Sequence, residues 1–307
     1  METRNPIVKK QKTMVVVKSP SLWRQTYRRL KKNKLAMTSL FFLLFMFLLS
    51  FIGPHFSPYI LDRTNIGDMN QPPSAAHWLG TDNYGRDVLT RLMMAGQISL
   101  TIGIAAMFLS VIIGSLLGAI SGFYRGVVDM VIMRIADILM SIPGLPLLLI
   151  LAAILSEWKV PAEYRLYIIM IMLSFVGWPG LARLVRGQIL SLKEQPFMQA
   201  TEVLGLSDRR KILHHLIPNS VPLLLVVATL NVAGSILSES ALSFLGLGVV
   251  PPTPSWGNMM DAANNFMDFR KRPWLWIPPG TAIFLTVVSI NLLGDGLRDA
   301  LDPKMRR

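Results

Sequence analysis

The sequence predicts an all-α membrane protein, and three observations favour this fold class. Hydrophobic residues make up 52% of the 307 residues and charged residues only 16%, whereas a typical soluble domain has about 25% charged residues. Apolar segments of about 20 residues recur along the chain, and a helix of that length crosses the hydrocarbon core of a bilayer. A polar stretch at 194–219 separates two of these segments and is long enough to form a loop outside the membrane.

Six segments have the length and composition of membrane-spanning helices. They are residues 35–55, 98–121, 133–155, 166–187, 220–247 and 276–296. We expect the first segment to remain as an anchor and not to be removed as a signal peptide, because a long tail precedes it and no small-residue cleavage site follows it. An even number of crossings places both ends of the chain on one side of the membrane.

The basic residues indicate which side that is. Of the 31 Lys and Arg residues, eleven lie in the tail up to Lys34, two at 125–134, six at 183–211 and four in the C-terminal tail. The three loops on the opposite side hold the other eight. Because Lys and Arg are enriched in cytoplasmic loops, we expect both termini and the loop between the fourth and fifth spans to be cytosolic.

This topology divides the chain into four parts. A basic cytosolic tail (1–34) precedes the first transmembrane helix and an outer loop (35–97). A core transmembrane domain (98–296) contains the polar loop (194–219). A short cytosolic tail (297–307) ends the chain.

The composition also argues against several other functions. A net charge of +13 suits nucleic acid or anionic lipid, but in a membrane protein the distribution of charge matters more than its sum, so we expect a bilayer and no nucleic acid. The absence of cysteine excludes disulfides and thiol catalysis. Gly80–Gly85 has the glycine spacing of a phosphate-binding loop, yet Arg86 and Asp87 stand where Lys and Ser or Thr are needed. The adjacent His214 and His215 diverge on a helix. We therefore expect no catalytic residue, no metal ligand and no bound cofactor.

The second span carries three glycines at intervals of four residues, Gly114, Gly118 and Gly122. Small residues at this spacing leave one helix face almost bare and let two backbones approach closely. We expect a tight helix contact there, either within this subunit or with another one. The prolines expected to bend spans are Pro143, Pro146, Pro179 and Pro222.

Ionisable residues inside the spans are candidates for function, because a charge in lipid is costly. Asp137 lies three residues after Arg134, and we expect the two to pair on one helix face near the cytosolic interface. Glu239 lies about twenty residues, or about 30 Å, along the fifth span, which places it near the outer interface. It is a candidate gate or pathway residue, with a purely structural role as the alternative.

The polar loop is predicted to form two short amphipathic helices. The first covers 194–204 and stops at Gly205, which readily adopts a positive φ. Ser207 is expected to cap the second helix with its hydroxyl, and Asp208 places a negative charge in the first turn. The second helix is expected to end at Pro218, which has no N–H to donate.

This loop resembles the coupling motif of the inner-membrane permease subunits of bacterial ABC importers. In that motif the residues EAA are followed by a Gly after three further residues and by a Pro thirteen residues beyond that Gly. The corresponding residues here are Gln199, Ala200, Thr201, Gly205 and Pro218. The spacing is kept, while the acidic first position has become Gln and His215 replaces the usual aliphatic residue.

Four other stretches resemble the C-type permease of oligopeptide, dipeptide and nickel systems. They are HWLGTDNYGRDVLTRLMMAGQISL (77–100), MRIADILMSIPGLPLLLI (133–150), SFLGLGVVPPTPSWG (243–257) and GDGLRDALDPK (294–304). The resemblance covers nearly the whole chain after the first twenty or so residues.

The resemblance implies a subunit of an ATP-driven importer in the bacterial cytoplasmic (inner) membrane. In such importers paired short helices sit in a groove of a separate ATPase, and closure of two ATPases switches the membrane helices between inward-open and outward-open forms. The loop would dock there, with Arg209 and Arg210 meeting acidic groups. The alternative is a hairpin that lies on the lipid headgroups.

The resemblance also implies partners and cargo. The chain would pair with a second, similar permease, with two cytosolic ATPases that hold ATP and Mg, and with an extracytoplasmic substrate-binding protein that faces the outer loops 78–87 and 251–256. The cargo would be oligopeptides or dipeptides, or alternatively nickel or another small solute. An ion-coupled secondary transporter is a further alternative, for which more buried carboxylates and an inverted repeat would be expected.

Overall fold

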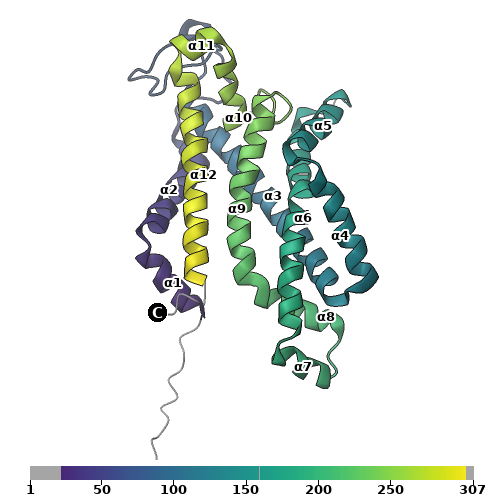
Figure 1. Ribbon diagram of the computed structural model, residues 1–307. Coiled ribbons are helices and arrows are strands. Elements are labelled where there is room, and N and C mark those ends of the chain that lie inside the picture. The colour runs from purple at the N-terminus through teal and green to yellow at the C-terminus, as the bar shows by residue number, and fades with distance from the viewer. Residues whose placement is uncertain (1–21, 159, 302–307) are drawn as a thin grey trace, which may run out of the picture.

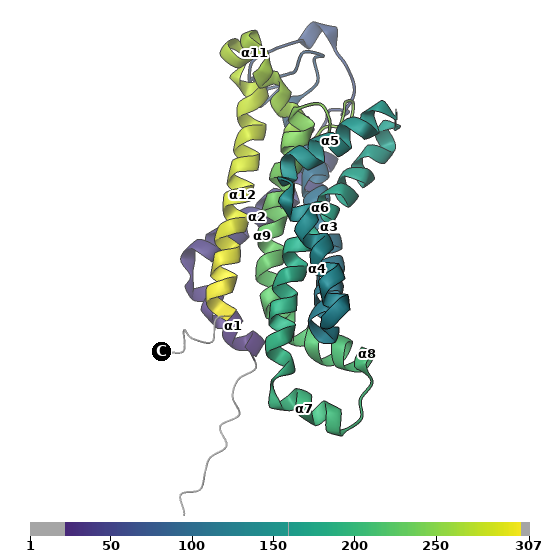
Figure 2. The same cartoon turned by 45° about the vertical axis from the view of Figure 1, so that its right-hand side comes forward.

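The computed structural model describes residues 22–158 and 160–301, and the described chain is mostly helical. Figures 1 and 2 show an elongated bundle whose long helices run between two ends. The helices labelled α1, α7 and α8 lie at one end, and α11 lies at the other. Residues 1–21 of the predicted N-terminal tail and 302–307 of the predicted C-terminal tail are outside the described chain.

Five long helices build the bundle. They are α2 (Lys34–Phe51), α3 (Val88–Tyr124), α6 (Ala162–Lys193), α9 (Ile217–Phe244) and α12 (Pro273–Leu301). The shorter helices are α1 (Leu22–Lys32), α4 (Gly126–Ser141), α5 (Gly144–Glu157), α7 (Pro196–Val203), α8 (Asp208–Arg210), α10 (Trp256–Met259) and α11 (Phe266–Lys271). The described chain also has the 3-10 helices η1 (Gly53–Phe56), η2 (Ile66–Asp68) and η4 (Met260–Asn264) and a π-helical turn, η3 (Lys211–Leu216).

In the described residues, five helical stretches are long and apolar enough to cross a membrane, and the bent pair α4 and α5 adds a sixth crossing if it counts as one span. The predicted all-α membrane fold is therefore confirmed. The expected third span (133–155) is formed by two helices, α4 and α5, which meet at a bend of 86°. It also begins earlier than expected, at Gly126. Pro143 explains the break. The residue before a proline avoids the helical region, and Ile142 is extended with φ −95° and ψ 126°.

Ion pairs hold α4 against α6. Arg186 donates to both oxygens of Asp129, from Nε at 2.6 Å and from Nη2 at 2.5 Å. Asp137 pairs with Arg183 of α6 and not with Arg134, so the predicted pair is wrong. The spacing of Arg134 and Asp137 permits a contact, but a guanidinium from a neighbouring packed helix reaches the same carboxylate and donates to it directly.

The central helix α3 packs against α6, α9 and α2. Its glycine face lies against α6. A Cβ added to Gly114 would be 2.8 Å from Leu181 Cβ, and one added to Gly122 would be 2.9 Å from the Arg186 carbonyl oxygen. Gly118, between them, meets the same helix. The tight contact that the sequence left open is thus made within this subunit.

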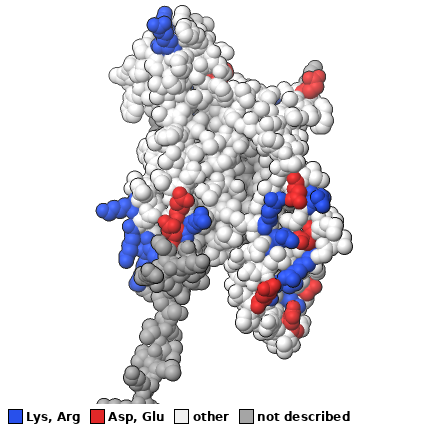
Figure 3. Space-filling model, in the orientation of Figure 1, with Lys and Arg blue, Asp and Glu red and all other residues white. Residues whose placement is uncertain are grey.

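Charged side chains are gathered at the end of the bundle that carries α1, α7 and α8, and a broad uncharged belt lies above them (Figure 3). Large apolar side chains are exposed on the helices of the bundle, among them Phe41 and Phe45 on α2, Ile112 on α3 and Phe284 on α12. An apolar surface of this extent is unsuited to water and suited to lipid.

Candidate functional site

The predicted two-helix loop lies at the charged end of the bundle and is formed by α7, α8 and η3 (Figures 1 and 2). The first helix begins at Pro196, two residues later than expected, because proline suits the first helical position. Gly205 follows it with φ +65°, as the sequence predicted. The Leu206 amide donates to the Thr201 carbonyl (3.1 Å) and the Gly205 amide to the Glu202 carbonyl (3.0 Å), a pattern that closes a helix end.

Two expectations about the second helix are wrong. Ser207 flanks its start, but the hydroxyl makes no capping bond, while Asp208 lies 3.6 Å from the Lys211 ammonium. Pro218 does not end the helix, since Asp208 to Phe244 form one helical stretch. The π-helical turn directly before Pro218 explains this continuity. Such local adjustments re-satisfy the backbone groups that a proline leaves unpaired.

The surface of the loop mixes polar and apolar side chains. Gln199 and Ala200 are exposed, whereas Thr201 is buried and its hydroxyl donates to a carbonyl of its own helix (2.6 Å). Val203 and Leu204, which sequence reasoning missed, are 89% and 74% exposed. In the sequence, the two consecutive apolar residues just before Gly205 could have indicated this exposed apolar tip. Exposed apolar side chains at the tip of a polar loop indicate a docking surface.

Basic groups lie beside this apolar tip. Arg209 and Arg210 are exposed, and within the part of the chain that the structure describes neither makes an ion pair. Lys211, by contrast, lies against Asp208. The two arginines are therefore available to acidic groups of another protein.

The inner side of the loop is fixed to the bundle. Met198 of α7 and Ile212 and Leu216 of η3 are buried in one cluster with Val185 and Ile189 of α6. Well-packed apolar contacts of this kind resist deformation. The inner side of the loop and α6 therefore pack as one unit.

Glu239 lies near the opposite end of α9 and is completely buried. Its Oε2 accepts a hydrogen bond from Ser99 of α3 (2.9 Å), and its Oε1 accepts one from Ser243 (2.7 Å). The Ser99 oxygen also accepts the backbone N–H of Trp256 (3.2 Å), so this polar cluster joins α3, α9 and α10. Sequence reasoning missed Ser99, which is 140 residues away along the chain. In this conformation protein atoms enclose Glu239 on all sides.

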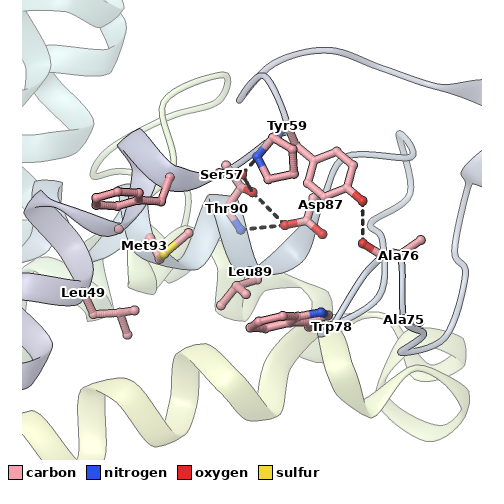
Figure 4. Close-up of a pocket in the computed structure, with 13 residues that line it drawn as sticks. Leu49, Ser57, Tyr59, Ala75, Ala76, Trp78, Asp87, Leu89, Thr90 and Met93 are labelled. Atoms are coloured by element: carbon pink, nitrogen blue, oxygen red, sulfur yellow. Dashed lines mark hydrogen bonds between the residues drawn. The ribbon is translucent and has the colours of Figure 1, made fainter.

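The end of the bundle opposite the two-helix loop contains an apolar cavity of about 520 Å³ between α2, the start of α3 and the segment before it (Figure 4). At its rim the Asp87 carboxylate accepts bonds from the Thr90 amide (2.8 Å) and the Thr90 hydroxyl (2.7 Å). Ser57 and Thr90 share a further bond of 2.6 Å. The site residues that the sequence predicted for the loop are not at this cavity.

The loops 78–87 and 251–256 both lie at this end of the molecule. Trp78 is 73% exposed and Tyr84 is 60% exposed, so the first loop presents aromatic side chains. Trp256 is completely buried, and its indole N–H donates to the Leu92 carbonyl at 3.2 Å. Of the second loop, only the part around Pro251 is free to meet a partner.

A bundle of membrane-spanning helices that presents a rigid, exposed two-helix loop at one end has the architecture of a membrane-embedded transport subunit. The chain belongs to the family described as binding-protein-dependent transport system inner membrane component, whose model matches residues 114–307. A second model, the N-terminal TM domain of oligopeptide transport permease C, matches residues 21–73. The resemblance inferred from the motifs is confirmed, and the chain is a transport component and not an enzyme.

Individual relatives agree with this assignment. The chain is 41% identical over 290 residues to the oligopeptide transport system permease protein OppC of Bacillus subtilis, covering 94% of this chain and 92% of that protein. It is 41% identical over 295 residues to the dipeptide transport system permease protein DppC of the same organism, covering 95% and 89%. It is 37% identical over 300 residues to the glutathione transport system permease protein GsiD of Pectobacterium atrosepticum, covering 96% of each.

Proposed function

We propose that this chain forms half of the translocation pathway of an ATP-driven importer that carries oligopeptides or dipeptides by alternating access. The observation that carries the proposal is the two-helix loop, whose inner side is packed into the bundle while its tip is exposed. A loop built in this way transmits movement of a docked partner to the membrane helices.

The composition of the tip supports docking in a groove of an ATPase. Val203 and Leu204 supply an apolar centre, and Arg209 and Arg210 supply charges beside it. An apolar core with a polar rim is the usual organisation of a protein interface. Because α8, η3 and α9 form one helical stretch, displacement of the loop moves α9, which carries Glu239 near its other end.

The distribution of charge supports the orientation. We propose that the loop and both termini are in the cytosol, because most Lys and Arg residues of the sequence lie in the two tails and in the segments predicted on the same side. Among the described residues, charged side chains gather at the end that carries α1, α7 and α8 (Figure 3). Two ATPases there hold ATP and Mg, and this chain holds no cofactor. A second, similar permease completes the pathway, and a substrate-binding protein docks at the outer end, where Trp78 and Tyr84 are exposed.

The relatives support the choice of cargo. Oligopeptides, dipeptides and glutathione are the cargoes in the names of proteins that match over more than nine tenths of this chain. Glutathione is itself a small peptide, so all three names share one chemical class. Nickel and other small solutes remain the competing cargoes that the motifs suggested.

Uptake by the complete complex, reconstituted into vesicles with its ATPases and binding protein, tests this function. We expect accumulation of radiolabelled dipeptides that needs ATP and is blocked by vanadate. Accumulation of nickel without peptide would replace the cargo. Uptake that follows an ion gradient in vesicles lacking the ATPases would instead identify a secondary transporter.

A further inference from the structure

The outer segment, residues 245–256, runs from the end of α9 to the first residue of α10 (Figure 1). Its tip, Pro251 and Pro252, is exposed. Val249 before the tip is only 4% exposed, and Trp256 after it is completely buried. Connecting segments usually run over the surface of a protein. Here the tip is free while residues on both sides of it are held inside the bundle.

Two serine hydroxyls hold the arms of the outer segment, one on each side of the tip. The Val249 amide donates to Ser243 Oγ at 3.0 Å. The Trp256 amide donates to Ser99 Oγ at 3.2 Å. Because Ser243 belongs to α9 and Ser99 to α3, the segment is fastened to two different helices. A buried backbone N–H needs an acceptor, and in both arms a serine oxygen supplies it.

Glu239 determines which way the two hydroxyls point. Ser99 donates to its Oε2 at 2.9 Å, and Ser243 donates to its Oε1 at 2.7 Å. A serine hydroxyl has one hydrogen to donate, and its oxygen has two lone pairs that accept. Because Glu239 takes the hydrogen of each serine, each oxygen is left to accept a backbone N–H of the outer segment. Glu239 thereby acts on both arms through the serines.

Further contacts join the two arms. Asn258 Nδ2 donates to the carbonyl of Val249 (3.1 Å), before the tip, and to that of Thr253 (2.9 Å), after it. A Cβ added to Gly257 would be 2.5 Å from the Ser240 carbonyl oxygen, so the chain lies directly on α9. Loss of one serine contact should therefore loosen both arms.

We propose that Glu239, Ser99 and Ser243 are positioning residues, which fix the outer segment so that its tip meets the substrate-binding protein. The tip lies at the end of the bundle opposite the two-helix loop, as does the loop 78–87 with its exposed aromatic side chains. A tip that is fixed before its partner arrives loses little conformational freedom on binding, which favours affinity. This inference rests on the proposed function, since it names residues that prepare a docking surface of the same importer.

Because the chain has no cysteine, single cysteines report on the outer segment directly. Val249→Cys keeps the backbone amide and places a thiol in a buried arm. Val185→Cys places one in the buried cluster between α6 and the two-helix loop, as a reporter on the rest of the bundle. The assembled complex in nanodiscs, without ATP, is treated with a maleimide. Both cysteines should react slowly in the otherwise unmodified complex.

Variants of the anchoring residues are then compared. Ser243→Ala removes the acceptor of the Val249 amide, and Glu239→Gln leaves one acceptor oxygen for two hydroxyls. We expect each change to speed labelling of Val249→Cys severalfold and to leave Val185→Cys slow. Ser220→Ala is the matched control, because this buried serine of α9 donates to a carbonyl of the preceding turn (3.0 Å). It should alter neither reporter.

Two results of this labelling would overturn the proposal. Faster labelling of both reporters would mean that the three residues only stabilise the bundle. Unchanged labelling of Val249→Cys would mean that they do not hold the outer segment.

A double variant tests whether Glu239 acts through the serines. Ser99→Ala alone should speed labelling of Val249→Cys. In that background the single acceptor oxygen of glutamine suffices for Ser243, so Glu239→Gln should add little. Additive effects would mean that Glu239 acts independently of Ser99, and the assignment would be wrong. Glu239→Asp, whose carboxylate is too short to reach both serines, replaces Glu239→Gln if that complex does not assemble.

An affinity measurement tests the purpose of the outer segment. The binding protein of the importer, loaded with alanyl-alanine, is titrated onto the immobilised nanodisc complex without ATP. We expect Ser243→Ala to weaken binding severalfold and Ser220→Ala to leave it unchanged. Unchanged affinity in Ser243→Ala, despite faster labelling of Val249→Cys, would mean that the tip does not meet the binding protein.

These measurements need neither ATP nor transport. Failure of ATP-driven uptake with the expected labelling and affinities would refute the proposed function alone. Unchanged labelling and affinity in a complex that transports normally would refute this inference alone.

Discussion

At the scale of single residues, Gly205 determines the turn between the two helices of the two-helix loop. No atom lies within 4 Å of a Cβ added to it, so only its φ of +65° requires glycine. We predict that Gly205→Val inserts normally but lowers ATP-driven uptake roughly tenfold. A left-handed conformation costs an ordinary L-residue about 1–2 kcal/mol, and about 1.4 kcal/mol is a factor of ten.

Gly205→Asn is the matched control, because asparagine tolerates the left-handed region better than valine does. Its uptake should lie close to that of the unmodified chain. Normal uptake by a correctly inserted Gly205→Val protein would contradict the coupling role of the loop.

Glu239 is the second residue whose role can be tested by one exchange. Glutamine keeps its size but replaces one acceptor with an N–H donor, so the hydroxyls of Ser99 and Ser243 can no longer both donate to it. We predict that Glu239→Gln reduces uptake while co-purification with the partner subunits is unchanged. Loss of one such buried bond costs about 1–3 kcal/mol.

The control for Glu239→Gln is Glu157→Gln, which removes the same charge from an exposed position outside the two-helix loop. It should transport normally. Unaltered uptake by Glu239→Gln would reject a gate role. If the Glu239→Gln complex failed to assemble, the role of Glu239 would be structural.

At the scale of elements, the contact between α3 and α6 depends on small residues. A Cβ at Gly122 would be 2.9 Å from the Arg186 carbonyl oxygen and 3.0 Å from Ile189 Cβ. We predict that Gly122→Ile lowers the stability of the solubilised protein by about 1–3 kcal/mol, because overpacking forces the two helices apart. Thermal unfolding followed by tryptophan fluorescence measures this change.

Gly187 of α6 provides the comparison, since no atom lies within 4 Å of a Cβ added to it. Gly187→Ala should leave the unfolding temperature unchanged or raise it slightly, because alanine favours a helix. If the two variants unfolded at the same temperature, close packing at Gly122 would not stabilise the bundle.

The same scale shows how far local patterns predict helices. The second span was placed at 98–121, but α3 begins at Val88, where the Asp87 carboxylate caps it by accepting the Thr90 amide (2.8 Å). The hydropathy pattern finds the uninterrupted apolar part of a helix and misses the turns before it, in which Thr90, Arg91 and Gln97 occur. In α9 the reverse holds, since Pro218 suggested an end where a π-helical turn keeps the helix continuous.

At the scale of the whole molecule, the topology makes a further prediction. Ser74 and Ser207 are both exposed and lie on opposite sides of the membrane in the proposed orientation. We predict that an impermeant maleimide added to intact cells labels Ser74→Cys and does not label Ser207→Cys. The physical cause is the excess of Lys and Arg that keeps the second region in the cytosol.

Permeabilised cells supply the control, because both cysteines should then react. Labelling of Ser207→Cys in intact cells would indicate the opposite orientation, in which the two-helix loop could not reach a cytosolic ATPase.

The sequence by itself determined the properties that depend on neighbouring residues: the apolar lengths of the spans, the unequal distribution of basic residues, the glycine face of α3 and the turn at Gly205. These follow from composition and spacing along one segment. Only the tertiary structure decided which groups meet. Arg183 pairs with Asp137, Ser99 binds Glu239, and Arg91 is buried in ion pairs with Asp62 and Asp82. Such partners come from helices far apart in the chain, and a polar group in an apolar interior is satisfied by whichever group the packing brings to it.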